Sequence, residues 1–168
     1  MDSTFSRGSF DKNSKRAKVG LEFQALVLEE FLSLGVIAKS VPGWLQMLDP
    51  DLSDGQIWKL EKTWGDIVLK KRDGSKIFIE CVTTSGEITP FPCSKIENFC
   101  GKNKWYLFGW DDKRYFVPSI QWNAWVSKRK KVEVREKDVV VFVSRKNYAS
   151  MRCGIFGFKN FLQYNAVI

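Results

Sequence analysis

The sequence contains no histidine. Its absence excludes Ser-His and Cys-His nucleophilic catalysis, a histidine general base and every metal site that requires imidazole. An enzyme with this sequence must therefore use carboxylates, lysines and a bound metal ion. The chain also lacks an apolar run of membrane-spanning length, and its polar, basic start has no secretory core. We expect an intracellular protein, cytoplasmic or nucleoid-associated, that does not bind membranes.

The sequence also has no CxxC motif and no excess of acidic over basic residues. The four cysteines form no CxxC motif, which favours a reduced, intracellular chain. The 27 Lys and Arg outnumber the 19 Asp and Glu, and the formal charge is +8. This balance favours a nucleic-acid partner, DNA or RNA. A soluble basic protein without such a partner is the alternative.

The length of 168 residues suits one domain. Residues 1–18 are polar and basic, and we expect a flexible arm there, followed by a single domain over 19–168. Lys15 and Arg16 in the arm would lie along DNA phosphates, which adds affinity without reading sequence. A disordered terminus without a ligand is the alternative.

A β-hairpin is the clearest local pattern in the chain. Asp66–Lys71 and Lys76–Val82 alternate apolar and polar residues on either side of Asp73-Gly74, which predicts two antiparallel strands. Because side chains alternate along a strand, Asp66 and Glu80 should lie side by side at one end of the ribbon.

Such a carboxylate pair needs an explanation. Two carboxylates a few Å apart repel by about 4 kcal/mol at an effective dielectric of about 20. They therefore share a proton, bind a cation or splay into water. The cation that suits hard oxygen ligands is Mg²⁺ or Mn²⁺. The alternative is that both are ordinary solvated acids at a strand end.

Periodicity predicts most of the remaining elements. Apolar residues at helical spacing predict a helix over Gly20 to Gly35, with the last glycine suited to a left-handed cap. Ser94 and Glu97 form a capping-box pattern that predicts a short helix, Ser94 to Cys100. The other expected elements are a strand at 36–40, a turn at 41–44, a loop at 83–92, a second hairpin from 104–110 and 114–118, two strands within 127–143, and a helix at 158–164. The last helix lies in an aromatic tail, which either covers the sheet or forms a dimer face.

The densest positive charge is the basic cluster, Lys128, Arg129, Lys130 and Lys131. Its functional interpretation is a phosphate-binding surface, and the alternative is a solvated loop. The nearby Trp122 and Trp125 either stack on unpaired bases or fill the core.

The order of the acids along the chain resembles a known nuclease pattern. A glutamate in an N-terminal helix, Glu22, is followed by Gly65-Asp66 at one strand and by Ile79-Glu80-Cys81-Val82 on the next. This arrangement resembles the PD-(D/E)XK nuclease superfamily over roughly Lys18 to Trp110, and it is most similar to archaeal-type Holliday-junction resolvases.

The resemblance implies an α/β fold with a restriction-endonuclease-like core, in which helices flank a mixed central β-sheet. It also implies hydrolysis of a phosphodiester with a divalent metal. By position, Asp66, Glu80 and the Cys81 carbonyl would hold Mg²⁺ or Mn²⁺, and Glu22 would orient water. A two-fold symmetric homodimer would suit a four-way DNA junction.

One position departs from the family pattern. The family has a lysine two residues after the second acid, where this chain has Val82. A lysine from elsewhere would have to replace it, and the candidates are Lys95 first and Lys70 second. For each, a solvated surface lysine is the alternative.

Two hypotheses of different classes follow. The first is a metal-dependent DNA endonuclease or resolvase-like phosphodiester hydrolase, with Glu22, Asp66, Glu80 and Lys95 as catalytic residues. The second is a nuclease-like fold that has lost catalysis and binds nucleic acid or a protein partner, which Val82 motivates. An RNA-directed nuclease is a further alternative, because phosphate contacts alone do not separate RNA from DNA.

Overall fold

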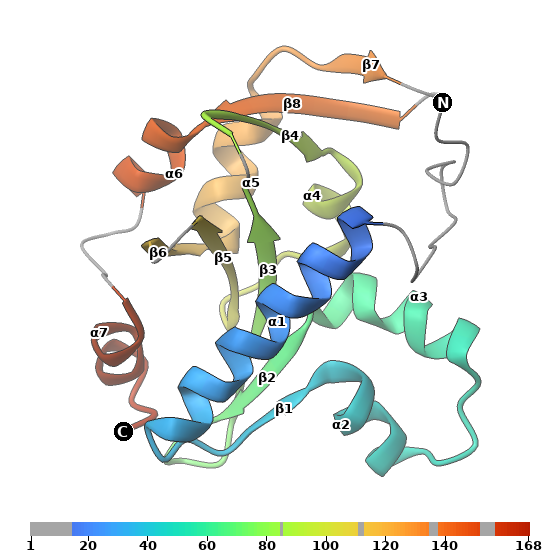
Figure 1. The fold of residues 1–168 in the computed structure, drawn as a ribbon, viewed down its shortest axis with the longest axis vertical. Coiled ribbons are helices and arrows are strands. Elements are labelled where there is room, and N and C mark those ends of the chain that lie inside the picture. Colours follow the sequence, from blue (N-terminus) through green and yellow to red (C-terminus); the bar gives the residue numbers. More distant parts are fainter. Residues whose placement is uncertain (1–14, 85, 111–112, 135–137, 152–156) are drawn as a thin grey trace.

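The computed structural model describes residues 15–84, 86–110, 113–134, 138–151 and 157–168. Within them the chain forms an α/β fold whose mixed central sheet is flanked by helices (Figure 1). The helices are α1 (Lys15–Ser33), α2 (Val41–Leu48), α3 (Asp54–Trp64), α4 (Ser94–Asn98), α5 (Ser119–Ser127), α6 (Arg145–Met151) and α7 (Gly157–Tyr164). The strands are β1 (Ala38–Ser40), β2 (Ile67–Lys70), β3 (Lys76–Thr83), β4 (Ile88–Pro92), β5 (Lys104–Trp110), β6 (Lys113–Pro118), β7 (Val132–Val134) and β8 (Asp138–Ser144).

The central sheet has the order β1-β2-β3-β5-β6. Strands β3 and β5 are parallel, and the other neighbours are antiparallel. The crossover from β3 to β5 carries β4 and α4, and Lys95 of α4 contacts Glu80 near the end of β3. This connection brings a helix from later in the chain to the edge where β2 begins.

Helices α1 and α7 cover one face of the sheet. Phe23, Val27 and Phe31 of α1 belong to the same buried cluster as Ile77 and Ile79 of β3. The aromatic tail adds to this cluster: the Phe161 ring of α7 stacks on Phe116, with 4.1 Å between ring centroids. The tail therefore covers the sheet, which is one of the two roles expected for it.

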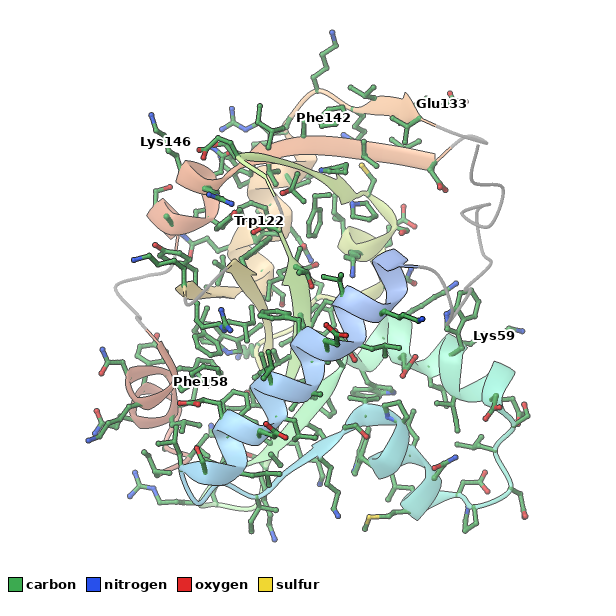
Figure 2. The ribbon with its side chains drawn as sticks, in the orientation of Figure 1. Lys59, Trp122, Glu133, Phe142, Lys146 and Phe158 are labelled. Atoms are coloured by element: carbon green, nitrogen blue, oxygen red, sulfur yellow. The ribbon has the colours of Figure 1, made fainter. Side chains whose placement is uncertain are left out.

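The opposite face supports a second buried cluster. Val68, Phe78 and Val82 face this side, where they meet residues from α2, α3, α5 and the small sheet. The small sheet has the order β4-β8-β7. Trp122 of α5 is fully buried among these groups (Figure 2). Its role is therefore to fill the core, which was the alternative to stacking on bases.

Several predicted elements are confirmed. Both hairpins form, from β2 and β3 and from β5 and β6. Helix α1 ends before Gly35, whose φ of +79° is the left-handed cap expected from the sequence. Strand β1 and helix α7 lie where periodicity predicts them. None of the helices that the structure describes is long and apolar enough to cross a membrane.

Four expectations need correction. Helix α1 begins at Lys15, so residues 15–18 of the predicted arm are helical, because nothing in Lys-Arg-Ala-Lys interrupts a helix. The predicted turn at 41–44 starts α2, because Ser40 accepts a hydrogen bond from the Gly43 N–H and Pro42 is tolerated in a first turn. Two other expected features lie outside the described residues: the part of the arm at 1–14, and residues 111–112 between the two strands of the second hairpin.

The other two corrections concern the crossover. The predicted loop at 83–92 contains β4, whose prolines are tolerated because it is an edge strand of the small sheet. The capping box expected at Ser94 does not form. Cys93 occupies the cap position and no side chain caps the helix there. Ser94 lies inside the first turn of α4, so its hydroxyl is not at the position that reaches the third helical N–H.

Candidate functional site

Gly65 joins α3 to β2 and sets the direction of Asp66. Its φ of 82° and ψ of −152° are accessible to glycine and not to other residues. A Cβ at this position would lie 2.7 Å from the Ile79 carbonyl oxygen and 2.9 Å from the Phe99 ring. The close approach lets the Asp66 N–H donate to the Ile79 carbonyl at 2.8 Å.

The hairpin brings Asp66 and Glu80 to the same end, where both line one cleft. The register of the two strands ends at Ile67 with Ile79, and Asp66 directly precedes Ile67, so it lies beside the part of β3 that carries Glu80. The Glu80 charge acts on the Asp66 carboxyl. The Cys81 N–H donates to Asp66 Oδ2 at 2.8 Å. A backbone group of β3 therefore holds one carboxylate beside the other.

Lys95 of α4 reaches the same end of the hairpin. Its Nζ donates a hydrogen bond to Glu80 Oε2 and forms an ion pair with it. The Glu80 side chain retains 13% of its exposure and the Lys95 side chain 28%. An ammonium group therefore stands beside the second acid although Val82 occupies the motif position.

Buried hydrogen bonds fix the helix that carries Lys95. The buried Asn123 side chain donates to the Phe99 carbonyl at 2.8 Å, just past the end of α4. The hydroxyl of buried Tyr106 donates to Asn123 Oδ1 at 2.8 Å. Because the last carbonyls of a helix lack partners within it, these contacts tie α4 to α5 and β5. The position of Lys95 is thereby set by the core.

Burial and neighbouring charges shift the pKa values of three groups in the site, those of Asp66, Lys95 and Cys81. Burial raises the pKa of Asp66 well above its usual value, and the Glu80 charge raises it further against the opposing effects of Lys95 and the Cys81 N–H. Burial lowers the pKa of Lys95, but the Glu80 and Asp66 carboxylates outweigh burial and raise it. Burial likewise raises the pKa of the Cys81 thiol well above its usual value, so this cysteine is a neutral side chain.

The raised pKa of Asp66 predicts how stability depends on pH. An unfolded aspartate titrates at about pH 3.9, and the folded one above it, so the folded chain binds the extra proton between the two values. The Asp66 contribution to the free energy of unfolding should therefore fall as pH rises through that window. Asp66→Asn should unfold at higher urea than wild type at pH 8 in EDTA, and the gap should shrink toward pH 4. An equal gap at both pH values would contradict this.

A cleft of about 250 Å³ opens over this end of the hairpin, between α3 and α4. Asp66, Glu80 and Lys95 line it, and α3 contributes Trp58, Glu61 and Lys62. The charge of Glu61 also raises the pKa of Asp66. None of these three α3 residues was predicted as a site residue from the sequence. Their spacing of three and four places them on one side of a helix, which was the available signal.

Glu22 does not line this cleft. Its side chain is exposed on α1, whose buried side chains pack against the opposite face of the sheet. Lys70 is exposed at the far end of β2, paired with Lys76 beside the turn. Of the two candidate lysines, the structure brings only Lys95 to the acids.

The basic cluster follows α5, and all four of its side chains are exposed. The Arg129 guanidinium lies over the Trp125 ring, 4.3 Å from its centroid, and the Lys131 ammonium donates to the Ser127 carbonyl. The cluster is therefore accessible to a ligand. The side chains of Lys15 and Arg16 lie outside the described part of the chain, and their role stays a prediction.

The oxygen atoms at the hairpin end fit a hard divalent cation. In the described residues, no three His, Cys, Asp or Glu side chains group as a metal site. Magnesium commonly uses one or two carboxylates and completes its shell with water and substrate oxygens. The N–H and C=O of one strand residue point to the same neighbour, so the Cys81 carbonyl points to the Asp66 side, as its N–H does. Two carboxylates and this carbonyl therefore belong to the same end of the hairpin.

Comparison with models of known protein families gives no match for this chain, and comparison with curated protein sequences gives none.

Proposed function

We propose that this chain is an endonuclease that hydrolyses DNA phosphodiesters with Mg²⁺ or Mn²⁺, of the resolvase-like kind that the PD-(D/E)XK resemblance implies. The observation that carries the proposal is the contact between Lys95 and Glu80, in the cleft that Asp66 also lines. It supplies two acids and a lysine at the end of one hairpin, although Val82 replaces the motif lysine.

In this proposal, Asp66, Glu80 and the Cys81 carbonyl hold the divalent ion. When bound, the ion supplies polarisation of the phosphate and a nucleophile near neutral pH. Lys95 orients the attacking water and stabilises the negative charge that develops on the phosphate. Such preorganised charges are among the largest contributions to catalysis.

With a divalent cation bound, the charge in the cleft would favour a polyanionic substrate. Its lining holds three carboxylates, Glu61, Asp66 and Glu80, and two ammonium groups, Lys62 and Lys95. The formal charge of −1 becomes +1 with a divalent cation, so phosphate and cation would favour each other's binding. The exposed basic cluster would hold the DNA backbone outside the cleft.

The test incubates the purified protein with duplex, single-stranded, flapped and four-way-junction DNA, and with RNA, in Mg²⁺, Mn²⁺ or EDTA. Cleavage of DNA that requires the metal is expected, together with loss of Mn²⁺ binding in Asp66→Ala by calorimetry. Salt-sensitive DNA binding without cleavage, unchanged in Glu80→Ala, would favour the non-catalytic alternative that Val82 motivates. Failure to cut any substrate, with normal Mn²⁺ binding by Asp66→Ala, would overturn the proposal.

A further inference from the structure

The α3 side of the cleft carries an aromatic ring and a cation that the proposed chemistry does not use. Trp58 is half-buried and Lys62 is exposed, and both line the cleft that holds Asp66, Glu80 and Lys95. The Lys62 ammonium lies over the Trp58 ring, 3.9 Å from its centroid. A flat π surface and a positive charge are therefore combined beside the acids.

The helix that carries these two residues is held in a fixed position. Residues four apart are neighbours on a helix surface, which accounts for the contact itself. Ser53 and Gln56 form a capping box at the start of α3, and the Gly65 N–H bonds the Glu61 carbonyl at its end. Trp64 packs edge-on against Trp44 of α2, with 6.0 Å between ring centroids. A platform on α3 is thus preorganised for a ligand.

The chemistry of this wall matches one nucleotide. Bases stack on aromatic side chains, and single-stranded DNA exposes base faces that continuous duplex keeps stacked inside the helix. The cleft volume of about 250 Å³ is below the roughly 300 to 1,000 Å³ of pockets for drug-sized ligands. A lysine side chain is flexible, so its ammonium can leave the ring for a phosphate as a base takes its place.

We propose that Trp58 and Lys62 bind an unpaired nucleotide next to the scissile phosphate, with the base on the Trp58 ring and the phosphate at the Lys62 ammonium. This inference rests on the proposed metal-dependent endonuclease activity, and among DNA substrates it favours flaps and forks over the paired four-way junction of a resolvase. The preferred substrate is DNA with a single-stranded segment at the cut, such as a flap or a fork. Continuous duplex and fully paired four-way junctions offer no base to this platform.

The experiment measures binding in EDTA, where the metal-dependent reaction does not run. Oligonucleotides with 2-aminopurine in a flap, in a single strand or within duplex report stacking by fluorescence quenching, and anisotropy reports affinity at fixed salt. The variants are Trp58→Ala, Trp58→Phe and Lys62→Ala. Lys59→Ala is the matched control, because Lys59 is exposed on the same helix, at the periphery of the fold (Figure 2), and does not line the cleft.

We expect wild type to bind flapped DNA more tightly than duplex and to quench 2-aminopurine. Trp58→Ala should abolish the quenching and lower flap affinity by roughly fivefold to a hundredfold, the contribution of one stacked base. Trp58→Phe should retain part of both effects, and Lys62→Ala should weaken flap binding more than Lys59→Ala does. Thermal melting confirms that each variant is folded.

Two outcomes separate this inference from the proposed function. If wild type binds and cuts flap and duplex equally, or if Trp58→Ala and Lys62→Ala leave flap binding and quenching unchanged, the platform is refuted and the nuclease proposal stands. If wild type binds no DNA of any form in EDTA and cuts none in Mg²⁺ or Mn²⁺, both proposals fail.

Discussion

Replacing Lys95 with alanine should lower the single-turnover rate of metal-dependent DNA cleavage by about a hundredfold to a thousandfold. The ammonium contacts Glu80 at the end of the hairpin, where it would stabilise charge that develops on the phosphate. A preorganised donor of this kind is worth roughly 3 to 4 kcal/mol in the transition state. DNA affinity should change little, because the exposed basic cluster supplies most of the backbone contacts in this proposal.

Two further variants test whether the cleavage rate depends on a positive charge at this position. Lys70→Ala should keep the wild-type rate, because Lys70 is exposed at the other end of β2. Val82→Lys in the Lys95→Ala background should recover part of the rate, because Val82 lies two residues beyond Glu80 on the same face of β3. A wild-type rate in Lys95→Ala would remove Lys95 from the mechanism.

Gly65→Ala should produce the largest loss of stability of any single alanine substitution discussed for this protein. The new Cβ would lie 2.7 Å from the Ile79 carbonyl oxygen and 2.9 Å from the Phe99 ring, at a φ of +82°. Strained backbone and steric overlap together should cost about 3 to 5 kcal/mol, compared with a total of about 5 to 15 kcal/mol for a typical domain. Urea unfolding followed by circular dichroism measures the change.

Alanine substitutions at two other glycines distinguish the cost of backbone strain from the cost of steric overlap. Gly74 has a φ of +89° with nothing near its Cβ position, so Gly74→Ala should cost only about 1 to 2 kcal/mol. Gly55 lies in the first turn of α3 with open space around it, and Gly55→Ala should be neutral or stabilise by up to about 1 kcal/mol. Equal costs at positions 65 and 74 would show that the contacts with β3 and Phe99 contribute nothing.

Local sequence was enough to predict both hairpins and the placement of Asp66 and Glu80 at one end of the first. Alternation along a strand specifies which side chains share a face, and the Asp-Gly turn specifies the register. The departure at Val82 was also visible in sequence, and it led to Lys95 as a candidate. The contact of Lys95 with Glu80 depends on how β4 and α4 return to the sheet, and a crossover of this length has no local signature.

The family resemblance implied Glu22 as the third acid, because the family pattern has a glutamate in an N-terminal helix. The structure places α1 on the opposite face of the sheet and brings Glu61 of α3 to the cleft. The family role of Glu22 stays a prediction, which Glu22→Gln compared with Glu61→Gln would test by Mn²⁺ affinity. The spacing of Trp58, Glu61 and Lys62 places them on one side of a helix, but only the tertiary structure shows that this side faces the acids.

The sequence by itself determined the absence of histidine chemistry, the basic charge and the hairpin with its two acids. These properties follow from the amino-acid composition and from patterns within short segments, so they do not depend on how the helices are arranged. Only the tertiary structure decided which lysine meets Glu80, which face α1 covers and which helix forms the wall opposite α4. These three features depend on packing between residues that are far apart in the chain. Apolar side chains are buried in two cores, one on each face of the central sheet, and this burial determines where the helices lie.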